Sequence, residues 1–193
     1  MPTSDISNIN KGDTTIVVDA LFSEVYQKSK RIHTETNGYF DPTVGHLVNA
    51  WGFGPEEAKK NMDSVAVQKM MQLVGFDKVQ LVKGKIRKQD ARIFLDFNSI
   101  AKGYGVDLIA GFLESENIQN YLVEIGGEIR ASGKNAAQNH WKIAIEKPNT
   151  DGTQSFQKTI ELSNQSMATS GNYRKFRISK EGKKYVALNV REY

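Results

Sequence analysis

Cysteine is absent from the 193-residue sequence. Disulfide bonds, thiolate metal sites and cysteine nucleophiles are therefore excluded. The absence leaves the compartment open, because exported proteins can also lack cysteine. Proline is scarce, with four residues, and no low-complexity linker or internal repeat divides the chain. The segments 134–140 and 147–154 are interpreted as surface loops between strands, so the sequence predicts one domain over residues 1–193.

Long hydrophobic runs and charge of one sign are also missing. No apolar stretch approaches the length of a membrane span, and the first residues, MPTSDISNINKGDTTI, are polar, so no signal peptide is predicted. The net charge is only +4, and Lys and Arg are scattered. A solvated basic surface is favoured over nucleic-acid binding. The three histidines show no metal-ligand spacing, and His46 is assigned a structural role.

The pattern of apolar residues predicts an α+β fold with a mixed, largely antiparallel sheet packed with helices. Helices are expected at 18–36, at 64–74 and directly after residue 97. The helix after residue 97 is expected to turn Ile100, Leu108, Ile109, Phe112 and Leu113 toward the core. Strands are expected at 78–82, 85–88, 92–97, 121–125, 141–146, 156–162, 173–179 and 184–190, with a Glu181-Gly182 turn joining the last two. Residues 92–125 are expected to have some βαβ character.

The joint within 94-FLDFNSIAKGYGVDLIAGFL-113 carries the clearest chemical signal. Asp96, Ser99 and Lys102 stand three residues apart where an apolar run gives way to a helical pattern. Helix N-termini bind anions, because their first amide groups lack partners and the backbone dipole points its positive end outward. The joint therefore indicates a phosphate site, although Asp96 or Ser99 can also serve simply to cap the helix.

Four further clusters combine glycine or small residues with polar side chains, and each has a structural interpretation of its own. Asp41-Pro42 is a common turn opener. Gly52-Phe53-Gly54 is compatible with a tight turn, and Gly126-Gly127 with a β-bulge. The clusters are NGYFDPTVG from residue 37, NAWGFGPEE from residue 49, VEIGGEIRASG from residue 123 and SMATSGNYRKF from residue 166.

Taken together and in this order, the clusters resemble the FAD:protein FMN transferase family, also called ApbE-like flavin transferases. The resemblance covers about residues 5–184 and rests on five ordered motifs: FDPTVG from residue 40, VNAWGFG from residue 48, LDFNSIAKGY from residue 95, VEIGGEIR from residue 123 and ATSGNYR from residue 168. It implies an ApbE-like fold and an Mg²⁺-dependent enzyme with FAD as substrate. The FMN half would be transferred through its phosphate to a Ser or Thr hydroxyl of a target protein (flavinylation), with AMP leaving.

The resemblance also implies a set of site residues, none of them with an assigned catalytic role. The expected FAD-contacting residues are Trp51, Gly52, Phe53, Asp96, Lys102 and Thr169. The expected metal ligands are the Ser99 hydroxyl and the Ala101 carbonyl, since hard cations take oxygen ligands. The implied partners are FAD and an acceptor protein, with a membrane contacted only through an N-terminal anchor that this sequence does not show. Family members are typically located in the cell envelope, on the periplasmic or outer side of the bacterial inner membrane.

The sequence departs from the family pattern at both ends. The family places an export or lipoprotein segment upstream, and an Asp and a Thr that ligate the metal downstream of the position of Tyr193. The expectation is therefore a partial ApbE-like domain, truncated at both ends, with weak Mg²⁺ dependence. Three hypotheses stay open: an FMN transferase or a fragment of one, an FAD-binding remnant without transfer, and a fragment that folds poorly because a sheet edge is open.

Overall fold

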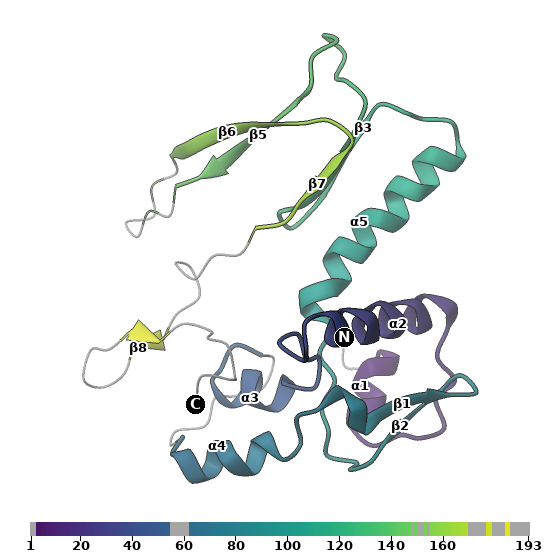
Figure 1. Cartoon of the computed structure of the whole chain (residues 1–193), viewed down its shortest axis with the longest axis vertical. Coiled ribbons are helices and arrows are strands. Elements are labelled where there is room, and N and C mark those ends of the chain that lie inside the picture. Colours follow the sequence, from purple (N-terminus) through teal and green to yellow (C-terminus); the bar gives the residue numbers. More distant parts are fainter. Residues whose placement is uncertain are drawn as a thin grey trace. The chain divides into compact units, whose positions relative to one another are not determined.

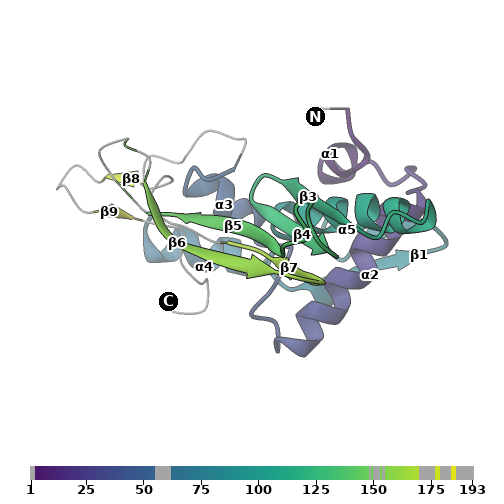
Figure 2. The same ribbon diagram turned by 90° about the horizontal axis from the view of Figure 1, so that it is seen from above.

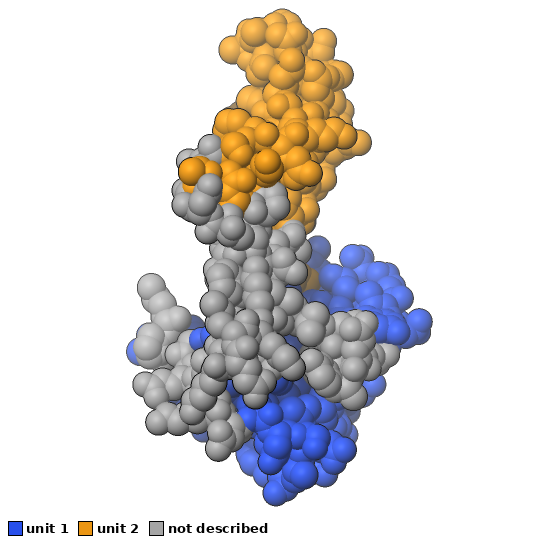
Figure 3. Space-filling view, turned by 90° about the vertical axis from the view of Figure 1, so that its left-hand side faces the viewer, with its two compact units in different colours: residues 1–99, 187–193 blue, residues 100–186 orange. Residues whose placement is uncertain are grey.

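The computed structural model describes residues 3–54, 62–147, 149, 153 and 155–169, together with the backbone of 177–178 and 184–185. The chain divides into two compact units. Unit 1 comprises residues 1–99 and 187–193, and unit 2 comprises residues 100–186 (Figure 3). The expectation of one domain over 1–193 stays a prediction.

Unit 1 is built mainly of helices, with one small hairpin (Figure 1). Its elements are α1 (Asp5–Asn10), α2 (Ala20–Glu35), α3 (Gly45–Ala50), α4 (Ser64–Met71), the 3-10 turn η1 (Phe76–Lys78), β1 (Val79–Val82) and β2 (Lys85–Lys88). Helix α2 begins where Asp19 accepts a hydrogen bond from the Phe22 amide at 2.7 Å. The β1–β2 turn is Lys83-Gly84, and both residues have positive φ, as a two-residue hairpin turn requires.

The core of unit 1 gathers around the buried Tyr26 side chain of α2. Its ring lies 5.1 Å from that of Phe76, and its hydroxyl donates to the Val79 carbonyl at 2.9 Å. Ile93 and Leu95, also fully buried, come from the segment that leads into the next helix. The ring of Phe97, in the same segment, lies 5.6 Å from that of Phe22 of α2, so the helix, the hairpin and this segment contribute to one core.

Unit 2 contains most of helix α5 (Asn98–Ser115), and its described residues form the strands β3 to β9, which pair antiparallel (Figure 2). A three-stranded sheet has the order β3-β4-β7, and β5 pairs with β6, and β8 with β9. The strands are β3 (Tyr121–Ile125), β4 (Glu128–Ser132), β5 (Trp141–Glu146), β6 (Phe156–Leu162), β7 (Gln165–Met167), β8 (Arg177–Ile178) and β9 (Lys184–Tyr185).

The β3–β4–β7 sheet is covered on both faces. Tyr121 and Val123 of β3 pack against Val106 and Ala110 of α5. Because side chains alternate along a strand, Leu122 points to the other face, where it joins a second cluster built on β4 and the β5–β6 pair. That cluster comprises Ile129, Ala131 and Leu162, with Leu122, Trp141, Ile143, Ile160 and Met167 around them.

The predicted α+β class and the mainly antiparallel pairing are confirmed, but the prediction for residues 92–97 is wrong. They form no strand and make only one parallel bridge, between Phe94 and Val44. The backbone of Leu95 pairs instead with the Asn10 side chain, and the Asp96 amide donates to the Pro42 carbonyl at 2.7 Å. Among the described residues, the expected βαβ unit is therefore not formed.

The predicted apolar face of α5 is also wrong in part. Leu108, Ile109 and Phe112 are 39%, 45% and 62% exposed, whereas Leu113 does pack against the core. The face of α5 that packs against β3 carries small residues. Ala110 is fully buried, and a Cβ added to Gly105 would lie 3.3 Å from Ile125. Small residues let helix and strand approach closely, which is why this side of α5 can pack against β3.

Two turn predictions had different outcomes. Gly126-Gly127 is not a bulge: Ile125 pairs with Glu128 and both glycines have positive φ, so the pair forms a two-residue hairpin turn. The Glu181-Gly182 turn and most of the strands predicted at 173–179 and 184–190 lie outside the described residues, although the short β8 and β9 do pair antiparallel.

Candidate functional site

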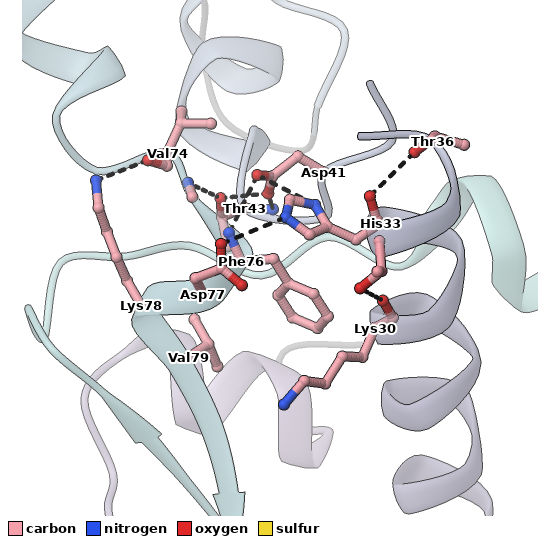
Figure 4. Close-up of polar contacts among 12 residues, drawn as sticks. Lys30, His33, Thr36, Asp41, Thr43, Val74, Phe76, Asp77, Lys78 and Val79 are labelled. Carbon is pink, nitrogen blue, oxygen red and sulfur yellow. Dashed lines mark hydrogen bonds and ion pairs between the residues drawn. The ribbon is translucent and has the colours of Figure 1, made fainter. Parts of the chain in front are cut away.

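Asp41 organises the FDPTVG motif at the start of α3 (Figure 4). Its carboxylate accepts hydrogen bonds from the amide and hydroxyl of Thr43 and, at 3.1 Å, from the Phe76 amide. The Nδ1 atom of His33 donates to the Phe40 carbonyl at 2.8 Å and lies 3.7 Å from Asp41 Oδ2. The turn-opening role predicted for Asp41-Pro42 is thus confirmed, and the motif joins α2, α3 and η1.

The segment Trp51-Gly52-Phe53 forms a tight turn at the end of α3. The Gly52 amide donates to the Asn49 carbonyl at 2.8 Å, and the Phe53 amide donates to the Val48 carbonyl at 2.9 Å. A Cβ at Gly54 would lie 1.8 Å from Asn49 Oδ1, so only glycine fits above that amide. All three residues of the segment are half-buried. The backbone is therefore held in a fixed course while the side chains keep some access to solvent.

Asp96 lies at the entrance of α5 with its backbone and side chain both bonded. Its Oδ1 accepts from the amide of Asn98, the first residue of α5, at 2.8 Å. The capping interpretation of Asp96 is therefore confirmed, and a function beyond it stays a prediction. Ser99 is the second residue of the helix and is exposed. The Asn98 amide donates to Asp96 and not to Ser99. The Ser99 side chain is accessible to solvent at the helix entrance.

In unit 2, Lys102 of α5 and Thr169 beyond β7 both lie against the Gly126-Gly127 turn. The Lys102 ammonium donates to the Gly126 carbonyl at 3.2 Å, and the Lys102 stem lies alongside Gly126. A Cβ at Gly127 would be 3.6 Å from the Thr169 hydroxyl. Three motifs far apart in the sequence thus meet at one hairpin turn.

Glu128 completes this cluster and was not recognised from the sequence. Its Oε2 lies 2.7 Å from the Lys102 ammonium, and its side chain is 21% exposed. The VEIGGEIR motif contains Glu128, but nothing in that motif shows that residue 102 packs against it. The signal that would have found the pair is the hairpin turn itself, which directs the first residue of β4 toward the start of α5.

The structure groups the predicted site residues within each unit. Unit 1 holds Trp51, Gly52, Phe53, Asp96 and Ser99, whereas unit 2 holds Ala101, Lys102 and Thr169. Asp96 precedes α5 by two residues, and Ser99 and Lys102 are the second and fifth residues of that helix. The phosphate site that their spacing predicted stays a prediction. Their roles in binding FAD or a metal stay predictions.

The metal prediction concerns two neutral oxygens, the Ser99 hydroxyl and the Ala101 carbonyl. An exposed hydroxyl and a main-chain carbonyl in the first turn of a helix are acceptable ligands for a hard cation such as Mg²⁺. Over the residues that the structure describes, no group of three or more His, Asp or Glu side chains is placed to hold a metal ion. Ser99 and Ala101 could therefore supply only part of a coordination shell.

In the described part of the chain, no helix has the length and apolar character needed to cross a membrane.

Comparison with known proteins finds relatives that match most of this chain. The ApbE family model matches residues 1–189. The FAD:protein FMN transferase of Haemophilus influenzae is 42% identical over 190 residues, covering 94% of this chain and 55% of the relative. The enzyme of the same name from Vibrio cholerae is 37% identical over 188 residues, with 94% and 55% covered. The chain thus spans about half the length of these relatives.

Solved structures show the same likeness in three dimensions. The flavin transferase ApbE from Vibrio cholerae matches with a TM-score of 0.78 and 36% identity, over 90% of this chain and 57% of that one. The apo form of the flavinyl transferase ApbE from Pseudomonas stutzeri matches with a TM-score of 0.81 and 31% identity, over 98% and 59%. The chain therefore shares the α+β fold of these flavin transferases over the part that it spans. The chain belongs to the ApbE family, as its five motifs predicted.

Proposed function

We propose that this chain carries the FAD-binding part of an FAD:protein FMN transferase. The observation that carries the proposal is the meeting of Lys102 and Thr169 at the Gly126-Gly127 turn. Both residues match FAD-contacting positions of the family, and an exposed cation at a glycine turn suits a phosphate-bearing ligand. The names of the relatives and the family match support the same activity.

The proposed reaction moves a phosphoryl-linked group. The acceptor Ser or Thr oxygen forms a bond to the phosphorus of the FMN half, the pyrophosphate P–O bond breaks, AMP leaves and the hydroxyl proton is released. An Mg²⁺ ion, when bound, would neutralise charge on the pyrophosphate, and Ser99 and Ala101 would supply part of its ligands. The chain's own residues bind and orient: Asp96 and Lys102 at the entrance of α5, and the Trp51–Phe53 backbone along the flavin.

Titration calorimetry of the 193-residue chain tests the binding part of the proposal. FAD should bind more tightly than NAD or ATP, because those nucleotides lack the flavin half that the Trp51–Phe53 segment is proposed to contact. Equal heats for the three nucleotides, or no heat with FAD, would contradict it.

Transfer is tested separately with an acceptor protein that carries an unmodified target Ser or Thr. The acceptor is incubated with FAD, Mg²⁺ and the chain, and in-gel flavin fluorescence reports a covalent product. Labelling supports the transferase. Binding of FAD without labelling supports the alternative, an FAD-binding protein that does not transfer FMN. An acceptor with the target Ser or Thr changed to Ala is the control.

A further inference from the structure

We propose that Glu128 is an internal competitor for Lys102, so that a phosphate must displace Glu128 before Lys102 can bind it. The inference rests on the proposed function, in which Lys102 contacts the phosphate-bearing part of FAD. It adds a residue that limits how strongly the site attracts anions.

The geometry gives Lys102 two partners on one hairpin turn. Its ammonium lies 2.7 Å from Glu128 Oε2 and 3.2 Å from the Gly126 carbonyl oxygen. Gly126 has a φ of +58°, and a Cβ there would lie 3.3 Å from the Lys102 side chain. The turn therefore leaves room for the lysine stem and directs its charged end to Glu128.

The ion pair matters more to Glu128 than to Lys102, because the carboxylate oxygen is buried whereas the ammonium can also be solvated by water. The Glu128 Oε2 atom is buried, and the Lys102 ammonium, 2.7 Å away, is the charged partner that the structure records for it. Lys102 is 48% exposed and can turn toward a ligand in solvent. A carboxylate in direct contact with the ammonium reduces the attraction that a second anion feels for it. When an anion binds Lys102, part of the binding free energy is therefore spent on separating the Lys102 ammonium from the Glu128 carboxylate.

The test compares Glu128→Gln, Lys102→Met and the double variant in the full chain. Glutamine keeps an oxygen that can accept from Lys102 while removing the charge, so the turn should keep its structure. The matched control is Glu161→Gln, which removes the same charge from the exposed Lys142–Glu161 ion pair in the same unit, where nitrogen and oxygen are 3.6 Å apart. Circular dichroism verifies that each variant is folded.

Four ligands separate charge from flavin recognition: FAD, ADP and inorganic pyrophosphate carry phosphate, whereas riboflavin is uncharged. At low salt, Glu128→Gln should tighten binding of the three anions about two- to fivefold, the range expected for one partly exposed ion pair. Riboflavin binding should not change. The gain in anion affinity should disappear at high salt and when Glu128→Gln is combined with Lys102→Met. The control Glu161→Gln should show no gain.

Each other result has a defined meaning. Weaker or unchanged anion binding by Glu128→Gln overturns the inference, as does an equal gain in the Lys102→Met background or with Glu161→Gln. If the original chain binds no FAD but Glu128→Gln gains affinity for pyrophosphate through Lys102, the proposed function fails and the inference holds. If none of the variants binds any of the anions, the inference is wrong.

Discussion

The Asn10 side chain pairs with the backbone of Leu95 as a neighbouring strand would. Its Nδ2 donates to the Leu95 carbonyl at 2.8 Å, and its Oδ1 accepts from the Leu95 amide at 2.8 Å. Leu95 is almost fully buried and directly precedes Asp96. Helix α1 thus holds the segment that delivers Asp96 to the entrance of α5.

Replacing Asn10 with Ala should destabilise the chain by about 2 kcal/mol, because two buried backbone groups of Leu95 lose their partners. Urea unfolding followed by circular dichroism measures the loss. Asn8→Ala on the same helix is the control, since the Asn8 bond to Thr3 is 3.4 Å long and exposed. A similar loss for both variants would show that the effect comes from α1 itself and not from the Leu95 pairing.

Asp41→Ala should lower the free energy of unfolding by on the order of 3 kcal/mol, because it removes three hydrogen bonds to a mostly buried carboxylate. Asp77→Ala is the matched control: its carboxyl is 92% exposed and 3.9 Å from His33, so the change should stay within about 0.5 kcal/mol. Thermal and urea unfolding of the two variants decide this. Comparable small effects would contradict the organising role given to Asp41.

These two networks mark the limit of what the sequence predicts. Helix α2 was predictable because its apolar residues repeat with the helical period and Asp19 stands at its start. The Lys83-Gly84 hairpin was predictable from local turn chemistry. Asn10 was not, because its role is a contact with a residue 85 positions away. The face of α5 was missed for a related reason, since close approach to β3 depends on the small residues and not on the apolar pattern.

The residues of the candidate site also fall into two groups, those predictable from local sequence and those brought together only by the fold. Asp96, Ser99 and Lys102 were found because their spacing follows one helix, and local spacing survives in any fold that forms that helix. The β3–β4 turn brings Glu128 to Lys102, and the pairing of β7 with β4 brings Thr169 to Gly127 of the same turn. Family motifs pointed to Thr169, whereas the Glu128 contact required the structure.

Tyr26 should make stability fall at alkaline pH. Burial raises the pKa of its phenol above 10.0, and the Asp77 carboxylate acts in the same direction. Because the folded state keeps a proton that the unfolded state releases, the stabilisation is fully present below the unfolded pKa, about 10, and is lost as the pH rises above it. Tyr26→Phe should lose about 1 kcal/mol at neutral pH through the missing bond to Val79.

The alkaline behaviour separates the two contributions of Tyr26. Tyr26→Phe should show a smaller decline in unfolding free energy between about pH 8 and about pH 11 than the original chain. Some decline should persist, since burial and the bond to Glu114 also raise the pKa of Tyr121. An unchanged slope in Tyr26→Phe would show that Tyr26 titrates alike in both states.

Gly54→Ala should disturb the Trp51–Phe53 turn. The new Cβ would lie 1.8 Å from Asn49 Oδ1, so the buried amide or the turn must shift, at a cost of about 1–3 kcal/mol. FAD affinity should fall with it if the turn lies along the flavin. Gly111→Ala is the control, because its added Cβ would meet no atom within 4 Å outside its chain neighbours and the backbone of its own helix, and alanine in a helix stabilises by about 0.5–1 kcal/mol. Opposite changes in melting temperature are expected, and a neutral Gly54→Ala would contradict the packing argument.

Asp96→Asn separates the structural role of this residue from its proposed role in binding. Asparagine keeps an oxygen that can accept from the Asn98 amide, so the start of α5 should stay intact and stability should change by less than about 0.5 kcal/mol. Asp96→Ala loses that bond and should cost about 1 kcal/mol. If the charged carboxylate contacts FAD or the residues that hold it, both variants should weaken FAD binding, by an amount equivalent to about 1–3 kcal/mol. Calorimetric titration with FAD, set beside urea unfolding of the same samples and of the exposed-site control Lys134→Ala, makes the comparison. Weak binding by Asp96→Ala alone would mean that Asp96 acts only by capping α5, and the binding role assigned to its charge would be withdrawn.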